Sequence, residues 1–536
     1  MERFFNTAGP LNVAEHYALD PLSRWDLPEV LRLIDQKKYF LVHAPRQTGK
    51  TTCLQALRDE INRQGHMKCL YVSMEGAQAA RQNIAGAMQG ILYHLGQEAC
   101  EQLQDPYMEQ NWERLLAKAG PLHALNALLN FWCNNSSKPI VLLMDEIDAL
   151  VGNTLISILR QLRLGYPKRS QHFPQSIVLC GMRHLRDYRM ELGEEGKQVL
   201  SEASPFNINS ESLRLGDFSQ DDVKVLYAQH TRQTGQQFED GVVERVFELT
   251  QGQPWLVNAL AYDICFRDKA GRDRSKTIML QEIDMAKEKL IQRRETHLDQ
   301  LMAKLKQERV RRVIEPMLLG IEQPMSPQDV EYVQDLGLIH CELNGEMRIA
   351  NPIYHEIIPR QLSHKHQLGM QRKQAHYVTA TGQLDMKKLL QTFQQFFREN
   401  ADSWLEGFQY KETGPHLILQ AFLQRIVNGG GTIHREYALG RRRTDLLVTW
   451  KGANPTQAHQ DQQKIVLELK LVRQKEAVDT KTREGLQQTA QYMDGCGATE
   501  GHLLMFDRRK NKSWDERIWV KQEQSSHDKQ ITVWGL

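Results

Sequence analysis

The chain has 536 residues, of which 41% are hydrophobic and 25% are charged, and its net charge at pH 7 is +2. This length exceeds what one hydrophobic core supports, so we expect about two to four domains. The small net charge excludes a strong overall attraction to nucleic acid, and no apolar run approaches the roughly 20 residues that span a bilayer.

Residues 1–204 alternate between apolar runs and helix-favouring segments. Runs at residues 39–43, 69–73, 140–144 and 177–180 have the length and β-branched content of buried strands. A helix is expected over residues 50–63. Strands separated by helices indicate a parallel sheet that is covered on both faces. We therefore predict an α/β core in residues 1–204.

The segment HAPRQTGKTTCL, residues 43–54, follows the first predicted strand and opens the predicted helix. It has the spacing G-x-x-x-x-G-K-[ST] of a phosphate-binding loop, with Ala44 in place of the first glycine. Lys50 is expected to reach the β- and γ-phosphates of ATP, and Thr51 to place its hydroxyl on Mg²⁺. The predicted nucleotide-binding residues are Ala44, Pro45, Arg46, Gln47, Thr48, Gly49, Lys50, Thr51, Thr52 and Asp145.

A second acidic motif supports this interpretation. The run IVLLMDEID, residues 140–148, ends an apolar strand in adjacent carboxylates. Asp145 is expected to hold Mg²⁺, and Glu146 to polarise the water that attacks ATP. Both motifs in this order predict ATP binding and, in addition, ATP hydrolysis.

Residues 205–385 lose the strand pattern of the core. Helices are predicted over residues 219–235, 242–250 and 255–266, which makes residues 205–300 a helical lid. A helix capped by Ser326, followed by strands at 336–339 and 347–350 around an Asn-Gly turn, predicts a winged helix in residues 301–362. Residues 363–385 are polar and basic, and are interpreted as a connector.

These motifs resemble the archaeal-type and signal-transduction (STAND-like) ATPases of the P-loop superfamily, an AAA-like class. HAPRQTGKTT is similar to their nucleotide loop, SIVLCGMRHLRDY to the following strand and sensor loop, and LTQGQPWLVNAL to the turn of their helical lid. The resemblance covers residues 16–360. It implies a lid and winged helix after the ATPase core, a sensor-like place for Arg183, and assembly into a homo-oligomer.

The C-terminal segment, residues 386–536, contains a second set of chemical groups. Asp445 begins an apolar strand, while Glu468 and Lys470 lie two apart on another strand and therefore point to one face. If these strands pair as a hairpin, Asp445 and Glu468 converge on a site for Mg²⁺ or Mn²⁺. Lys470 would then orient the attacking water and stabilise charge on a phosphate. Gln488 and Tyr492 share one helix face.

The set Asp445, Glu468-x-Lys470 and Gln488-x-x-x-Tyr492 resembles the PD-(D/E)XK nuclease superfamily, especially its exonuclease-like branch. The resemblance covers about residues 386–510 and implies a restriction-endonuclease-like α/β domain. An upstream glutamate often joins the metal site in this family, and both Glu436 and Glu412 are candidates. The expected catalytic residues of the whole chain are Glu146, Asp445, Glu468, Lys470, Gln488 and Tyr492.

The leading hypothesis is an ATPase that controls a Mg²⁺-dependent nuclease, with DNA as the expected nucleic acid and a protein or nucleic-acid trigger. Fusions of this type imply a role in defence against foreign DNA. The alternative is a signalling or scaffold ATPase whose nuclease-like domain binds nucleic acid or protein without cutting, and a DNA motor ranks below both. Eight scattered cysteines without a CxxC pair, and a start that lacks a signal-peptide layout, predict a cytoplasmic protein.

Overall fold

The computed structural model divides into two compact units. The N-terminal unit comprises Met1–Val313 and Pro324–His355, and the C-terminal unit comprises Ile314–Gln323 and Glu356–Leu536. The structure describes residues 2–182, 209–293, 295–319, 324–342, 346–362, 377–379, 381–406, 419, 422–423, 431–439, 442–450, 463–472, 477–507, 509, 512–525 and 529–536. Of strand β8 beyond Ile433, and of the first four residues of β9, only the backbone is described.

A five-stranded, fully parallel sheet forms the centre of the N-terminal unit. Its spatial order is β2 (Lys68–Ser73), β3 (Ile140–Asp145), β4 (Ser176–Gly181), β1 (Tyr39–His43) and β5 (Asn209–Arg214). The four predicted strands are all present. Strand β5 falls in the range that we predicted as helical lid. Its sequence NSESLR lacks an apolar run because it is an edge strand that pairs only with β1.

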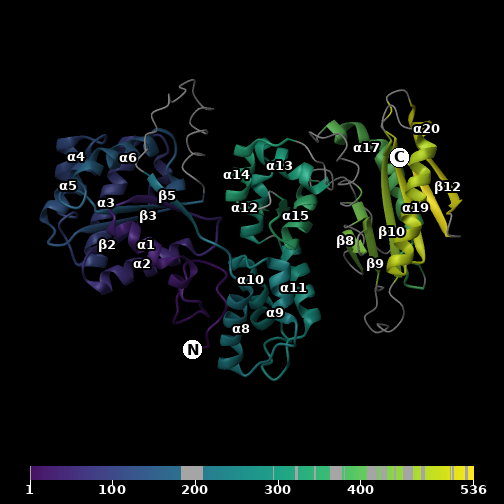
Figure 1. The fold of residues 1–536 in the computed structure, drawn as a ribbon, viewed down its shortest axis with the longest axis horizontal. Coiled ribbons are helices and arrows are strands. Elements are labelled where there is room, and N and C mark those ends of the chain that lie inside the picture. The colour runs from purple at the N-terminus through teal and green to yellow at the C-terminus, as the bar shows by residue number, and fades with distance from the viewer. Residues whose placement is uncertain are drawn as a thin grey trace. The chain divides into compact units, whose positions relative to one another are not determined.

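Helices cover both faces of this sheet, as predicted (Figure 1). Helices α1 (Leu27–Asp35) and α2 (Lys50–Gln64) pack on the face that carries Phe40, Val42, Leu143 and Val178. The opposite face packs against three further helices, α3 (Ile84–Leu103), α5 (Ala124–Asn135) and α6 (Gly152–Gly165), and α4 (Trp112–Ala119) packs on α3 and α5. Two separate apolar cores therefore hold the sheet edge where β1 and β3 end.

Three helices lie close to their predicted ranges, namely α8 (Gln220–Thr234), α9 (Val242–Thr250) and α10 (Pro254–Tyr262). Helix α11 (Leu280–Arg293) follows them. The N-terminal residues Phe5 and Tyr17 are buried among aromatic rings of this region, with ring centroids 5.3 Å apart for Phe5 and Tyr227 and 5.6 Å apart for Tyr17 and His230. The first residues of the chain thus pack against helix α8.

After the lid come α12 (Thr296–Lys304), α13 (Glu308–Leu319), α14 (Pro327–Asp335), the antiparallel strands β6 (Ile339–Cys341) and β7 (Met347–Ile349), and α15 (Pro352–Leu362). Ser326 caps α14 as predicted, since its side chain accepts from the Asp329 amide. The strand predicted at residues 336–339 begins later because Gly337 has φ +76° and closes the end of the helix.

A six-stranded mixed sheet forms the C-terminal unit. Its order is β12 (Trp519–Gln524), β13 (Gln530–Gly535), β11 (Glu500–Asp507), β10 (Gln463–Val472), β9 (Arg442–Trp450) and β8 (Gly431–Leu439). Strands β8, β9 and β10 are antiparallel neighbours, whereas β10 and β11 are parallel and are connected through helix α19 (Val478–Cys496).

Helices lie on both faces of this second sheet. Helix α19 packs on the face that includes Val466, Leu503 and Met505. Helix α17 (Met386–Glu406) contacts the other face, where the rings of Phe397 and Phe506 are 5.4 Å apart. The last residues of the predicted connector also pack here, because Trp450 Nε1 donates to the Gly382 carbonyl at 2.9 Å.

Some expectations fall where the structure gives no description. Arg183 and Glu412 lie outside the described residues. In the described parts, no helix is both long and apolar enough to cross a membrane. All eight cysteines are free thiols.

Candidate functional site

The loop between β1 and α2 has the backbone shape that its sequence predicts. Gly49 precedes the first turn of α2 with φ +90°, a conformation that favours glycine, and Gln47 has φ 57°. A Cβ on Gly49 would lie 2.8 Å from Nη1 of Arg24. Ala44, at the position of the usual first glycine, is fully buried. The backbone therefore strongly favours glycine at position 49, while position 44 accommodates a methyl group.

Side chains of the loop are held by short contacts. Lys50 Nζ donates to the carbonyl oxygens of Ala44 and Pro45, both at 2.8 Å. The Thr48 hydroxyl donates to the Pro45 carbonyl at 2.8 Å, and the Thr52 hydroxyl accepts from the Leu11 amide at 3.3 Å. A polyphosphate would offer the Lys50 ammonium charged acceptors in place of these carbonyls.

Two loop residues also contact the segment that follows the lid. Arg46 Nη1 donates to Gln300 Oε1 of α12 at 2.6 Å. Pro45 lies directly against Gly337, where a Cβ would be 2.6 Å from Pro45 Cγ. Side chains of the phosphate loop are therefore in contact with α12 and with the turn after α14, all within the N-terminal unit.

Thr51 and Asp145, the two predicted Mg²⁺ ligands, meet at the carboxyl edge of the sheet. The Thr51 hydroxyl donates to Asp145 Oδ2 at 2.6 Å, and Asp145 is 1% exposed. The Tyr71 hydroxyl donates to the same oxygen at 3.0 Å, and the Glu146 amide donates to Oδ1 at 2.8 Å. A hydroxyl and a carboxylate are the hard oxygen donors that Mg²⁺ prefers, so these residues fit the ion.

Glu146 follows directly, with φ 53°. Burial raises the pKa of its carboxyl, the charges of Glu75 and Asp145 raise it further, and Lys50 and Arg46 oppose the shift. Glu75 comes two residues after Ser73, which is the register partner of Asp145 on β2. A carboxylate with a raised pKa is a better proton acceptor near neutral pH, as the predicted role of Glu146 requires.

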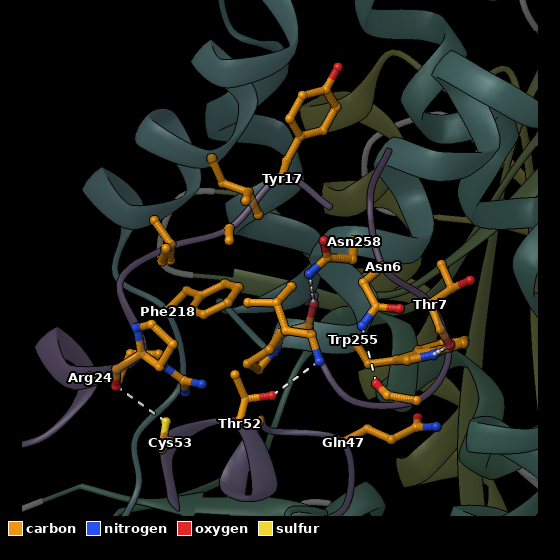
Figure 2. A pocket seen from close by; sticks show the side chains of 18 of the residues that line it. Asn6, Thr7, Tyr17, Arg24, Gln47, Thr52, Cys53, Phe218, Trp255 and Asn258 are labelled. Atoms are coloured by element: carbon orange, nitrogen blue, oxygen red, sulfur yellow. Dashed lines mark hydrogen bonds between the residues drawn. The ribbon is translucent and has the colours of Figure 1, made fainter. Parts of the chain in front are cut away.

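A cavity of about 140 Å³ adjoins the loop and the start of α2. Figure 2 shows its walls, which come from the N-terminal segment (Asn6, Thr7), from the loop and α2 (Gln47, Thr52), and from the lid region (Phe218, Trp255, Asn258). Trp255 is tied to the N-terminal segment by a bond from its Nε1 to the Thr7 carbonyl at 2.9 Å. An apolar cavity of about 150 Å³ holds one benzene ring, so this one is of the size of a single six-membered ring.

Arg24 connects the wall of this cavity to the loop. Its guanidinium donates to the carbonyl oxygens of Thr48 and Gly216, and it lies 4.8 Å from the ring centroid of Phe218. The loop and the first residues of the lid are thus linked by one side chain.

The C-terminal unit brings the strands of Asp445 and Glu468 together. Strands β9 and β10 pair with Leu446 opposite Leu467 and Leu447 opposite Val466. In the same register, the next pair is Asp445 and Glu468. The Asp445 side chain lies outside the described part, so only its backbone position is given. Glu436, the nearer upstream candidate, is likewise known only as a backbone position on β8.

Glu468 and Lys470 point to the α19 face of β10 and form an ion pair, with Nζ 2.8 Å from Oε1. Their side chains are 4% and 20% exposed, respectively. Burying a carboxylate is costly unless a cation and hydrogen bonds compensate for it, and Lys470 provides that charge here.

Gln488 and Tyr492 lie one helical turn apart on α19, the helix that covers this face. Tyr492 is buried, and Gln488 Oε1 is buried without a hydrogen-bond partner among the described residues. Among the described side chains, which do not include Asp445, no cluster of three or more His, Cys, Asp or Glu residues could hold a metal ion.

The family model of the AAA-like domain matches residues 31–357, more than half of the chain. The chain belongs to the AAA-like domain family. This match includes the phosphate loop, Asp145, Glu146, the lid and the segment up to α15. It confirms the coarser part of the resemblance stated from the sequence, which is an AAA-like P-loop ATPase.

Solved structures show low similarity to this AAA-like protein. A Walker-type ATPase of Pyrococcus abyssi is 14% identical, with a TM-score of 0.45, over 66% of this chain and 99% of that one. The RuvB Holliday junction branch migration motor of Thermotoga maritima is 15% identical, with a TM-score of 0.32, over 60% and 90%. Drosophila ORC bound to DNA is 14% identical, with a TM-score of 0.33, over 65% and 87%. TM-scores this low support no functional conclusion, and no curated protein matches the chain.

Three features of the AAA-like domain were missed from the sequence. They are the hydroxyl of Tyr71 on Asp145, the charge of Glu75 beside Glu146, and the N-terminal wall of the cavity. A polar residue near the end of β2 was the only available signal for the first two. The third has no sequence signal, because Asn6 and Thr7 lie in a segment with neither helical nor strand periodicity.

Proposed function

We propose that the AAA-like domain binds Mg·ATP and hydrolyses it. The loop of residues 44–52 would hold the phosphates, Thr51 and Asp145 the Mg²⁺ ion, and Glu146 would accept the proton of the attacking water. Magnesium would supply charge neutralisation on the phosphates. The cavity beside Thr52 and Trp255 would take the base.

One observation carries this proposal: the Thr51 hydroxyl and the Asp145 carboxylate, which are 94 residues apart in sequence, are 2.6 Å apart in space. An isolated Gly-Lys-Thr turn, or two acids at a strand end, would not produce this contact. Lys50 begins the same helix, and the N-terminus of a helix itself favours anions.

Two variants distinguish ATP hydrolysis from ATP binding. Glu146→Gln removes the proton acceptor and should lower ATP turnover by about 10²-fold or more while Mg·ATP still binds. Lys50→Ala should weaken binding itself. Glu113→Gln, an exposed residue on α4, is the matched control and should hydrolyse ATP at the wild-type rate. Unchanged turnover in Glu146→Gln would refute the role of Glu146.

We infer further that the nucleotide state controls a Mg²⁺-dependent nuclease in the C-terminal unit. The register that makes Asp445 and Glu468 the next pair on β9 and β10, together with the Glu468–Lys470 ion pair at 2.8 Å, supports this output. Asp445 and Glu468 would hold Mg²⁺ or Mn²⁺, Lys470 would stabilise charge on the phosphate, and Gln488 and Tyr492 would line the site. The proposed substrate is DNA, and the proposed role is defence against foreign DNA. The same proposal includes assembly of the chain into a homo-oligomer and activation by a protein or nucleic-acid trigger.

Cleavage has its own matched pair of variants. Lys470→Met removes the cation from the proposed site, whereas Lys464→Met changes the same face of the same strand at its other end, where Nζ donates to the Cys496 carbonyl. We expect metal-dependent DNA cleavage to fall about 10²-fold or more in Lys470→Met and to persist in Lys464→Met. Equal cleavage by both variants would show that Lys470 takes no part in cutting and would refute the proposed nuclease site.

A further inference from the structure

Tyr71 lies at the proposed magnesium site without belonging to either nucleotide motif. It is on β2, in register with Leu143 of β3, two positions before the Ser73–Asp145 pair. Alternation along a strand puts Tyr71 on the same sheet face as Asp145, the face on which α2 packs. Its hydroxyl donates to Asp145 Oδ2 at 3.0 Å.

The backbone of Tyr71 is fixed on both sides although β2 is an edge strand of the sheet. On one side β2 pairs with β3. On the other, Gln102 of α3 takes the place of a further strand: the Tyr71 amide donates to Gln102 Oε1 at 3.1 Å, and Gln102 Nε2 donates to the Tyr71 carbonyl at 2.8 Å. This clamp limits the movement of the phenol ring relative to Asp145.

The hydrogen bonds on Asp145 divide between its two oxygens. A carboxylate oxygen has about two acceptor positions. Oδ2 accepts from the hydroxyls of Thr51 and Tyr71, so its positions are used, and Oδ1 accepts from the Glu146 amide. A further donor, such as the hydration shell of a magnesium ion, therefore has to approach Oδ1.

We propose that Tyr71 is a positioning residue of the Mg·ATP site, whose hydroxyl holds Asp145 by Oδ2 and leaves Oδ1 for the hydrated magnesium ion. This inference rests on the proposed Mg·ATP function and adds a residue outside both motifs. A tyrosine hydroxyl is protonated at physiological pH and can therefore donate this hydrogen bond.

Loss of the hydroxyl should weaken the response to magnesium and leave metal-free nucleotide binding intact. In Tyr71→Phe, Oδ2 loses one charge-assisted donor and the carboxylate gains freedom to rotate. We expect the Mg²⁺ concentration that half-saturates binding of a non-hydrolysable ATP analogue to rise about tenfold. Binding of the same analogue in EDTA should match the wild type, because the Tyr71 hydroxyl contacts the side chains of Asp145 and Thr51, which are the proposed metal ligands.

Tyr39→Phe provides a matched control. Tyr39 begins β1 of the same sheet, and its hydroxyl donates to the Pro174 carbonyl at 2.8 Å. Each substitution thus removes one hydroxyl hydrogen bond from the same sheet. Calorimetry of the full chain should show small decreases in melting temperature for both variants, while only Tyr71→Phe should change the magnesium dependence.

The experiment is isothermal titration calorimetry of the full chain with the analogue at several Mg²⁺ concentrations. The role of Tyr71 would be overturned if the wild type and Tyr71→Phe showed the same magnesium dependence, or if Tyr39→Phe changed this dependence as much as Tyr71→Phe does. Either result would leave the proposed ATPase function standing. Wild-type binding without any response to Mg²⁺ would instead refute the proposed Mg·ATP site itself.

Discussion

Replacing Gly49 by alanine should damage the phosphate loop in two separable ways. Gly49 has φ +90°, where an L-residue costs about 1–2 kcal/mol. The new Cβ would also lie 2.8 Å from Arg24 Nη1, so the guanidinium has to move. Arg24 donates to the Thr48 and Gly216 carbonyls, and losing one hydrogen bond of a charged group costs about 1.5–3 kcal/mol. Together these effects should lower the stability of the N-terminal unit by about 2.5–5 kcal/mol.

Gly65→Ala separates the two contributions. Gly65 ends the same helix with φ +77°, and nothing lies within 4 Å of its added Cβ. It should therefore cost only the backbone strain of about 1–2 kcal/mol and leave ATP affinity unchanged. Differential scanning calorimetry of the full chain gives the stability, and titration with an ATP analogue gives the affinity. The reasoning is refuted if Gly49→Ala melts at the same temperature as Gly65→Ala and binds the analogue like the wild type.

Three further predictions follow from the same unit. In Glu75→Gln, loss of a neighbouring negative charge should lower the pKa of Glu146, so the acidic limb of the kcat/KM profile for ATP should move to lower pH; an unmoved limb would exclude this coupling. Burial lowers the pKa of His297 to about 4, so between pH 6.5 and about 4 the unfolded chain binds more protons than the folded one, and the stability falls as the pH falls through that range. His297→Phe should remove about 3 kcal/mol of this pH dependence, as measured by denaturant titrations. A variant with the same pH dependence as the wild type would refute this role of His297. Asn258→Trp should fill the cavity and lower ATP affinity about tenfold or more while inorganic tripolyphosphate binds as before; equal losses for both ligands would show that the cavity does not take the base.

The phosphate loop was predictable because its residues are contiguous. Gly49, Lys50 and Thr51 have fixed spacing, and the strand and helix around them have strong apolar periodicity. Strand β5 was not predictable in this way, because an edge strand with Ser212 and Glu211 carries little apolar signal. Its place in the sheet depends on pairing with β1, a contact that the local sequence does not encode.

The residues of the candidate sites also differ in whether a contiguous sequence motif could predict them. Thr51 and Asp145 could be matched through two known motifs, whereas Tyr71 reaches Asp145 only through the register of β2 and β3. The hairpin predicted for Asp445 and Glu468 required only that β9 and β10 pair in sequence order, and they do. The cavity wall joins Thr7 and Trp255, which are 248 residues apart in sequence, so neither segment alone could indicate it.

Digestion of circular and linear DNA by the full chain tests the proposed coupling most directly. The wild type should cut DNA when Mg²⁺ is present, and adding EDTA should abolish this cleavage. Glu468→Gln should not cut. Lys50→Ala should cut at a rate that no longer changes when ATP is added. Cleavage that persists in Glu468→Gln, or a wild-type rate that is the same with and without ATP, would contradict an ATP-controlled nuclease.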